Sequence, residues 1–368
     1  MTIYILIALL LFAGVVSKQG KRIYKIGLFC LFFISAFRAI ELGGTDVYNY
    51  QSFYEEVPTI FHLSGFESRY TIGFTVLCAF IKSFSSSYLV FQFVYAGISI
   101  FLLNKVVKTL ELGGDQECLF LFSYFCLRFI YFSWVAYRQN IANLLFWFFL
   151  AALYKEIGED NNSGGCVPSG KWKKVFLIIC ILFIPPLFHS SAWANTVLLL
   201  IQFCLNKLGY NFKKLFVPVL SVVIYFIGTT VFPVLLDIMC TIDSRYLMYN
   251  GVITLRGNTI YYILRFAFLI LFFMYYQSER YRLKNMFMDS LCLMVLLGSI
   301  NMEIMSRIFE YYAVGLYGVM ALCLNYFNSK CRRLAMIIYF AGFFIIFVRF
   351  LLITDNGLYF NYSFWFYN

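Results

Sequence analysis

Long apolar segments follow one another along nearly the whole chain, with only short polar stretches between them. Of the 368 residues, 62% are hydrophobic and 13% are charged, whereas a soluble domain has about 25% charged residues. The runs are apolar on all sides, which excludes a transmembrane barrel and disorder. We therefore predict an all-α polytopic membrane protein. The runs lie at 2–16, 26–40, 71–84, 88–104, 118–136, 139–154, 175–189, 191–206, 215–232, 259–277, 286–301, 308–327 and 334–352.

The basic residues set the predicted orientation. No basic residue precedes the first run, and Lys18, Lys21, Arg22 and Lys25 follow it. A cleavable signal peptide has the opposite polarity, so we expect an uncleaved anchor with its N-terminus outside. All the basic loops are cytoplasmic if about twelve of the runs (11–13) cross the membrane. We expect the whole chain, 1–368, to form one transmembrane domain. These loops lie at 18–25, 105–108, 155–174, 207–214, 280–284 and 330–333.

The 71–84 run does not cross in this topology, because about a dozen apolar residues are too few to span a bilayer. We expect it to lie on or dip into the outer leaflet. Just before it, Val47, Tyr50, Tyr54 and Val57 repeat at helical spacing, which predicts an amphipathic interfacial helix. Three loops follow from this interpretation: a periplasmic loop with two juxtamembrane helices at 41–87, a flexible cytoplasmic loop at 155–173 and a second periplasmic loop at 233–258.

Lysine and arginine divide between the two sides of the membrane. On the inner side lie fourteen of the lysines and five arginines, and on the outer half lie nine arginines and Lys82. Insertion bias and anionic lipids account for the inner lysines. The planar fork of arginine binds phosphate bidentately, so the outer arginines indicate a lipid-linked phosphate or pyrophosphate ligand. Pairing with the outer acids, or snorkelling from helix ends, is the alternative.

The strongest candidate for acid–base chemistry is Asp46, at the start of the first outer loop. Gly43 and Gly44 permit a sharp turn, and Thr45 is a suitable cap for the helix that follows. Asp46 is then in a first helical turn at the membrane surface, where a carboxylate could act as general base on a sugar hydroxyl. The alternative is an aspartate favoured there only by the helix dipole.

Further polar positions interrupt the apolar runs. Glu67 opens the dipping helix, where it either takes part in catalysis or marks the interface. Arg138 and Gln139 lie in a compact turn that can point side chains into the bundle. His189 lies in the segment Pro185–Trp193, which we expect to break a helix near the outer surface. This histidine would act on a phosphate or as acid–base, or would only bond a carbonyl.

A last charged group opens the run at 308–327. Glu303 and Arg307 are four residues apart, which is the spacing of a structural ion pair on a helix, although charges at membrane depth are usually functional. The chain has two histidines and no CxxC pair, GxSxG, Walker loop or GxGxxG motif. We therefore expect no metal, no cofactor and no nucleic-acid partner.

Taken together, these motifs resemble the EpsG/Wzy-like group of bacterial polysaccharide polymerases. The resemblance extends from Arg38 to Tyr312. Its first outer loop is also similar to that of the GT-C glycosyltransferases, which keep their catalytic acid there, although Asp46 has no neighbouring second acid. The motifs are Arg38 with Gly44-Thr45-Asp46-x-x-x-Tyr50, Glu67, Arg138-Gln139, His189-Ser190-Ser191 and Arg307-x-x-x-x-Tyr312.

The resemblance implies an O-antigen, capsule or exopolysaccharide polymerase in the bacterial inner membrane. Such an enzyme moves glycan from an undecaprenyl-pyrophosphate carrier to a lipid-linked repeat unit at the periplasmic face. Asp46 is then the candidate base, with Glu67 in reserve, and His189 completes the catalytic set. The expected pyrophosphate contacts are Arg38, Arg138, Gln139, Arg307 and Tyr312.

Three alternatives stay open: a glycan ligase, a single-sugar transferase of the GT-C type, and a non-catalytic flippase of lipid-linked oligosaccharides. A flippase should carry polar residues along a cavity open to both faces, and the outer position of the arginines disfavours it. The expected partners are lipid-linked oligosaccharides and the bilayer, and candidate protein partners are a chain-length regulator or a flippase.

Overall fold

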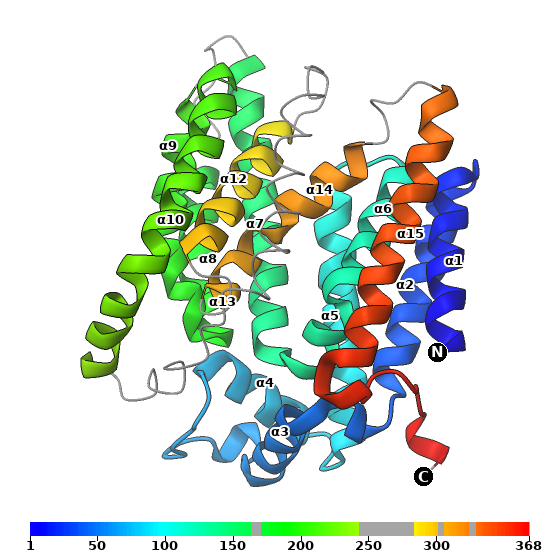
Figure 1. Cartoon of the computed structure of the whole chain (residues 1–368). Coiled ribbons are helices and arrows are strands. Elements are labelled where there is room, and N and C mark those ends of the chain that lie inside the picture. Colours follow the sequence, from blue (N-terminus) through cyan, green and yellow to red (C-terminus); the bar gives the residue numbers. More distant parts are fainter. Residues whose placement is uncertain (163–170, 209, 243–282, 301–304, 324–328, 368) are drawn as a thin grey trace. The chain divides into compact units, whose positions relative to one another are not determined.

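The computed structural model describes residues 1–162, 171–208, 210–242, 283–300, 305–323 and 329–367. Over these ranges the fold is all helical, without a strand, as predicted (Figure 1). The helices form two compact units, one of Met1–Ser190 with Met320–Asn368 and the other of Ser191–Val319. No linker in the sequence marks this division of the expected single domain, and each unit is described by itself.

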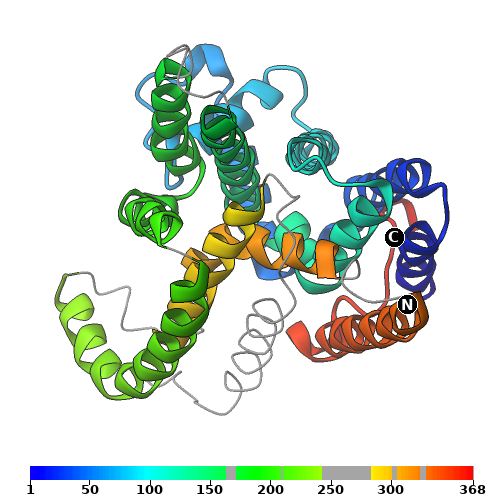
Figure 2. The same ribbon diagram turned by 90° about the horizontal axis from the view of Figure 1, so that it is seen from above.

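The first unit is a bundle whose helices coincide with the apolar runs. Helix α1 packs on α2 and α6, α2 also packs on α5, α5 on α7, and α7 on α8. In Figure 2, α15 (orange-red) runs beside α1 (dark blue), and the rings of Phe12 and Phe340 are 4.5 Å apart there. The helices are α1 (Thr2–Val16), α2 (Gly20–Ala36), α5 (Tyr88–Thr109), α6 (Gly114–Tyr124), α7 (Tyr137–Asn162), α8 (Lys171–Phe188) and α15 (Ser329–Ile353).

The apolar character of these helices is that of a membrane protein. Within the described ranges, Tyr88–Thr109 and Leu334–Ile353 are long and apolar enough to cross a bilayer, and four further helices are apolar but shorter. Leu334, Ile338 and Ile345 of α15 are more than 60% exposed, which favours contact with lipid over contact with water. The number of crossings stays a prediction.

Two helices form within the predicted loop 41–87, α3 (Gly44–Glu56) and α4 (Ile72–Lys82). The expected apolar face of α3 is buried, since Val47, Tyr50, Tyr54 and Val57 are at most 6% exposed. They pack with residues of α4, α5 and α7 in one core cluster. Helix α4 has 11 residues, too few to span a bilayer. The segment 41–87 therefore contains two helices, and their position at the membrane surface, like the side on which they lie, stays a prediction.

Helices α3 and α4 lie at the end of the first unit where α1 begins (Figure 1). The segment after α15 returns to the same end, where the backbone N–H of Ala39 donates to the carbonyl of Ser363 at 2.9 Å. The N-terminal amine donates to the carbonyl of Phe360 at 3.0 Å. Basic residues that follow α1 and begin α15 lie at the opposite end. The predicted topology assigns those residues to the cytoplasmic side, and this orientation stays a prediction.

The second unit contains a buried ion pair. Helix α12 packs on α9 and α10, and Lys213 Nζ lies 2.6 Å from Asp289 Oδ1, with the side chains 4% and 0% exposed. Gln202 donates to Ser290 Oγ at 3.1 Å beside this pair. The helices are α9 (Asn195–Lys207), α10 (Tyr210–Ile242), α12 (Lys284–Ile300), α13 (Ser306–Phe309) and α14 (Ala313–Cys323), with the 3-10 turn η8 (Glu310–Tyr312) between the last two.

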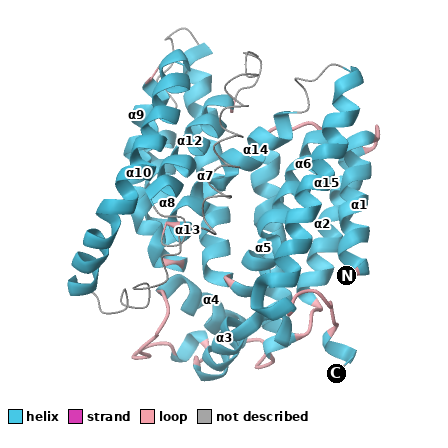
Figure 3. Ribbon diagram, viewed as in Figure 1, coloured by secondary structure: helices cyan, strands magenta, loops and turns pink. Residues whose placement is uncertain are grey.

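Some predicted segments differ from the structure or lie outside the described residues. Helix α10 continues to Ile242, so the first ten residues of the predicted loop 233–258 are helical (Figure 3). The rest of that loop and the apolar run 259–277 lie outside the described ranges. In the predicted flexible loop 155–173, the ends belong to α7 and α8, and residues 163–170 are not described.

Two glycines in helix interiors provide a matched test of the packing. A Cβ at Gly315 would lie 2.5 Å from the backbone nitrogen of Leu291, whereas a Cβ at Gly342 has nothing within 4 Å. We expect Gly315→Ala to lower the free energy of unfolding by about 1–3 kcal/mol because the backbones of α12 and α14 must separate. Gly342→Ala should instead be neutral or raise stability by up to about 1 kcal/mol. Thermal unfolding of the purified protein in detergent measures both, and equal shifts would contradict the close approach.

Candidate functional site

Arg38 joins the end of α2 to the start of α7. Its side chain is 0% exposed, and Nη1 donates to the carbonyls of Ala39 and Ile40 at 3.1 and 3.3 Å. Nη2 donates to the carbonyl of Trp134 at 3.1 Å and to the hydroxyl of Tyr137. Since both terminal nitrogens are taken up in this way, Arg38 holds the backbone before α3 against the turn before α7.

This turn follows two π-helical segments, η3 (Phe125–Phe129) and η4 (Tyr131–Val135), which continue α6. Segments of this kind are rare and often occur at functional sites, because the extra residue changes the direction in which side chains point. The chain then reverses at Ala136, which has φ −98° and ψ 57°. The next helix, α7, begins at Tyr137 and carries Arg138 in its first turn.

Asp46 lies in the first turn of α3, as predicted. The turn before it depends on Gly44, whose φ of +62° is in the left-handed region that favours glycine. Gly43 is the N-cap and α3 begins at Gly44, two residues before the start that a Thr45 cap requires, so the suggested capping role of Thr45 is wrong. The Asp46 side chain is exposed, and within the described part of the chain it has no ion-pair partner.

Arg138 is half-buried beside two tyrosines. Its guanidinium carbon lies 4.2 Å from the ring centre of Tyr70, and it is close enough to the Tyr50 hydroxyl to lower the pKa of that group. Its Nε is buried without a hydrogen-bond partner, and no described carboxylate forms an ion pair with it. A half-buried guanidinium held by rings and lacking an acid partner is suited to receive an anion.

The charges of Asp46 and Arg138 change the pKa values of the same two tyrosines, Tyr50 and Tyr70. Burial is the main cause that raises the pKa of Tyr50 to about 12, with Arg138 opposing the rise and Asp46 adding to it. Burial also raises the pKa of Tyr70, again with opposing effects of Arg138 and Asp46. Both phenols therefore stay protonated at neutral pH. We call Asp46, Tyr50, Tyr70 and Arg138 the loop site.

His189 lies next to the loop site along α4. The Thr71 hydroxyl donates to the carbonyl of Phe188 at 2.7 Å, so the end of α8 packs on the residue after Tyr70. The helix break predicted within Pro185–Trp193 is confirmed: α8 contains both prolines and ends at Phe188, and a 3-10 segment, η6 (Ser190–Ala194), follows. His189 directly follows Phe188, with its backbone N–H donating to the carbonyl of Pro185 at 3.1 Å.

The other predicted site residues are more scattered. Glu67 is exposed in the loop before α4, and Gln139 is 4% exposed inside α7. In the second unit, Arg307 is exposed on α13, and Tyr312 is 0% exposed in η8. Glu303, the suggested partner of Arg307, lies outside the described residues, as do Arg245, Arg256 and Arg265.

Sequence reasoning assigned Tyr50 to the apolar face of a helix and to a family motif but not to the site, and it assigned no role to Tyr70. Tyr50 lies four residues after Asp46, which places both on one side of α3, and this spacing could have identified it. Tyr70 has no comparable signal, because its contact with Arg138 joins residues far apart in the sequence. Arg69, whose guanidinium carbon is 5.5 Å from the Tyr70 ring centre, lies beside the same ring.

A comparison with protein families decides how this geometry is interpreted. A family model described as the EpsG family matches residues 21–364, which include every predicted site residue. The chain belongs to the EpsG family. No curated protein and no solved structure matches it. Membership of the EpsG family indicates a polysaccharide polymerase of the glycosyltransferase type, working on lipid-linked oligosaccharides in a membrane.

Proposed function

We propose that this EpsG-family protein transfers glycan from an undecaprenyl-pyrophosphate carrier to a lipid-linked repeat unit at the periplasmic face of the bacterial inner membrane. The observation that carries the proposal is the loop site. There, an exposed carboxylate and a half-buried arginine without an acid partner flank the same two tyrosines. Glycosyl transfer from a diphosphate requires this pair of groups, one to accept a proton and one to neutralise the departing anion.

The roles follow from the bonds that change. Asp46 accepts the proton of the acceptor hydroxyl as its oxygen bonds to the anomeric carbon of the donor sugar. The bond between that carbon and the pyrophosphate oxygen breaks, and its electron pair leaves with the lipid diphosphate. Arg138 neutralises the charge that develops on the diphosphate, where a positioned cation in a region of low dielectric constant is most effective.

Neighbouring residues support these two groups. Tyr70 holds the guanidinium of Arg138 by stacking, and the Tyr50 hydroxyl lies near it. We assign His189 as a donor to the leaving diphosphate, because Thr71, the residue after Tyr70, bonds to Phe188, the residue before His189. Arg38 positions α3 relative to α7 instead of contacting the diphosphate, because its terminal nitrogens already bind carbonyls and a hydroxyl.

The remaining assignments stay predictions. Glu67 is the reserve base, and Gln139, Arg307 and Tyr312 are further candidates for the diphosphate contact. The periplasmic position of the loop site rests on the charge distribution of the sequence, and a chain-length regulator or flippase remains a candidate partner. Labelling of single cysteines from each side of the membrane tests the position: access to residue 46 from the cytoplasmic side only would contradict it.

Reconstitution tests the function directly. The purified full chain in liposomes is given purified lipid-linked repeat units, and the products are separated by gel electrophoresis. We expect a ladder of glycans, since a polymerase uses its product as a substrate again. A single added unit would indicate a ligase or single-sugar transferase, and movement of lipid without a new glycosidic bond would indicate a flippase. Long polymer made by an Arg138→Ala variant would contradict the diphosphate assignment.

A further inference from the structure

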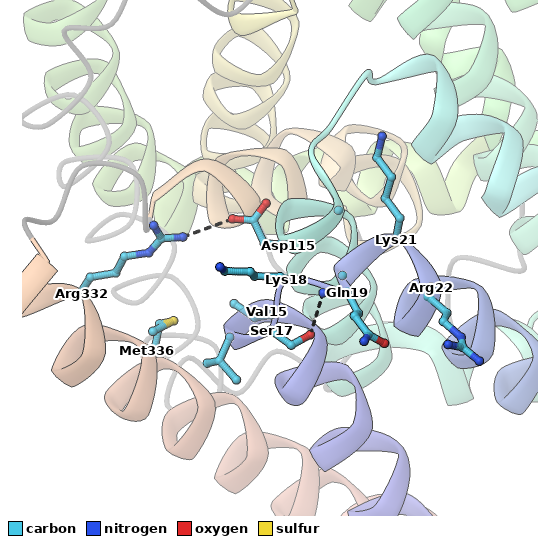
Figure 4. Close-up of a pocket in the computed structure, with 12 residues that line it drawn as sticks. Val15, Ser17, Lys18, Gln19, Lys21, Arg22, Asp115, Arg332 and Met336 are labelled. Atoms are coloured by element: carbon cyan, nitrogen blue, oxygen red, sulfur yellow. Dashed lines mark hydrogen bonds and ion pairs between the residues drawn. The ribbon is translucent and has the colours of Figure 1, made fainter.

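A cavity of about 1130 Å³ opens at the end of the first unit that lies opposite the loop site. Four helix ends meet there: α1 ends, α2 and α6 begin, and the first turns of α15 follow (Figure 4). The proposed transfer reaction uses none of its residues. The cavity combines a charged rim with an apolar wall.

The charges around this basic cavity are unbalanced. Lys18, Lys21, Arg22 and Arg332 line it together with one carboxylate, Asp115. Arg332 Nη2 lies 3.2 Å from Asp115 Oδ2, which neutralises one cation. Lys18 extends toward this pair in Figure 4, whereas Lys21 and Arg22 point away from it at the rim. Within the described part of the chain, Lys18, Lys21 and Arg22 have no anionic partner.

The backbone around the cavity is held in place without a ligand. Helices α2 and α6 cross at two glycines, where a Cβ on Gly20 would lie 2.6 Å from the carbonyl carbon of Gly114. The Cys118 thiol donates to the carbonyl of Gly20 at 3.2 Å. Contacts this close cannot tighten further, so the cavity does not close by a shift of these helices. The cationic side chains therefore surround a preformed space.

One wall of the cavity is apolar. Val15, Val16 and Met336 line it beside the cations, and Val16 is 56% exposed. A free inorganic anion gains nothing from such a wall, whereas a phospholipid carries a phosphodiester next to glycerol and acyl chains. Basic pockets at the cytoplasmic ends of membrane helices bind such head groups.

We propose that the basic cavity binds the head group of an anionic phospholipid. Lys18 contacts the phosphodiester, Lys21 and Arg22 add positive charge at the rim, and Val15, Val16 and Met336 contact the start of the acyl chains. The general excess of basic residues on cytoplasmic loops requires no cavity and no apolar wall, so it does not account for this arrangement. The bound lipid would fasten α1, α2, α6 and α15 together at the end opposite the loop site.

Native mass spectrometry of the purified full chain tests the proposal. The protein is exchanged into phosphatidylglycerol or, as the zwitterionic comparison, phosphatidylcholine, and retained lipid is counted as detergent is increased. We expect selective retention of phosphatidylglycerol, lowered about fivefold by Lys18→Gln. The matched control is Lys25→Gln, which removes the same charge from an exposed position in α2 outside the cavity and should retain lipid as the parent does.

Several outcomes would overturn the proposal. An equal loss of phosphatidylglycerol in the Lys18 and Lys25 variants would show that the lipid is attracted by the surface charge in general and not by the cavity. Equal retention of phosphatidylglycerol and phosphatidylcholine would show that the charge of the lipid does not matter. Displacement of the lipid by millimolar inorganic phosphate would assign the cavity to a free anion. Val16→Ser is a second variant that keeps every charge: it should weaken lipid retention without changing phosphate binding, and no change in retention would exclude the acyl contact.

Discussion

Replacing Asp46 by asparagine is expected to abolish nearly all polymerisation. The amide keeps the size and polarity of the side chain but cannot accept the proton of the acceptor hydroxyl. A general base contributes about 10²–10⁴-fold to the rate, so glycan synthesis by liposomes containing the variant should fall by that factor. Because the Asp46 side chain is exposed, thermal unfolding of the variant should match that of the parent.

The control for this substitution lies on the same helix. Glu55, near the end of α3, accepts a hydrogen bond from Gln51 at 3.1 Å and is outside the loop site. Glu55→Gln should leave the rate unchanged. If Glu67→Gln abolished synthesis while Asp46→Asn did not, the base would be Glu67. A carrier without catalysis would keep its lipid transport in all three variants, which separates that alternative from an enzyme.

The second large effect is expected on folding. Asp289→Asn leaves the ammonium of Lys213 buried, at 4% exposure, without its carboxylate. Breaking one side of a buried ion pair costs about 3–5 kcal/mol, a large share of the roughly 5–15 kcal/mol by which proteins are stable. We expect poor yield of folded protein and a strongly lowered Tm in detergent.

A double substitution distinguishes the lost charge from lost packing. Lys213→Met with Asp289→Leu removes both charges and fills the space, so most of the stability should return. The exposed pair of Lys155 and Glu111, with side chains 35% and 42% exposed, provides the matched control, because breaking it should cost at most about 1 kcal/mol. If Asp289→Asn cost no more than Lys155→Gln, the buried pair would not be important for folding.

Much of the helical structure could be predicted from the sequence. An apolar run such as 88–104 can satisfy its backbone in a membrane only as a helix, and α5 contains that run. The spacing of Val47, Tyr50, Tyr54 and Val57 likewise identified the buried face of α3. These predictions succeed because they depend on local periodicity and length. The division into two units depends on packing between distant helices and had no local signal.

The candidate site was harder to predict, because its chemistry depends on distant contacts. An arginine at a helix end looks the same in the sequence whether it faces a phosphate or a carbonyl. Arg38 binds the carbonyl of Trp134, 96 residues away, which only tertiary packing can specify. The Arg138 guanidinium is held by its contact with the ring of Tyr70, and no sequence motif indicates that these two residues are neighbours.

The return of the C-terminal segment to the end of α2 has a consequence for biogenesis. The backbone of Ala39, next to Arg38, bonds to Ser363, which is translated after every helix from α3 to α15. The segment before α3 is therefore made long before this backbone partner exists. A nascent chain that has not yet reached the segment after α15 lacks this support, so the loop that begins at α3 reaches its final conformation only after α15 has been made.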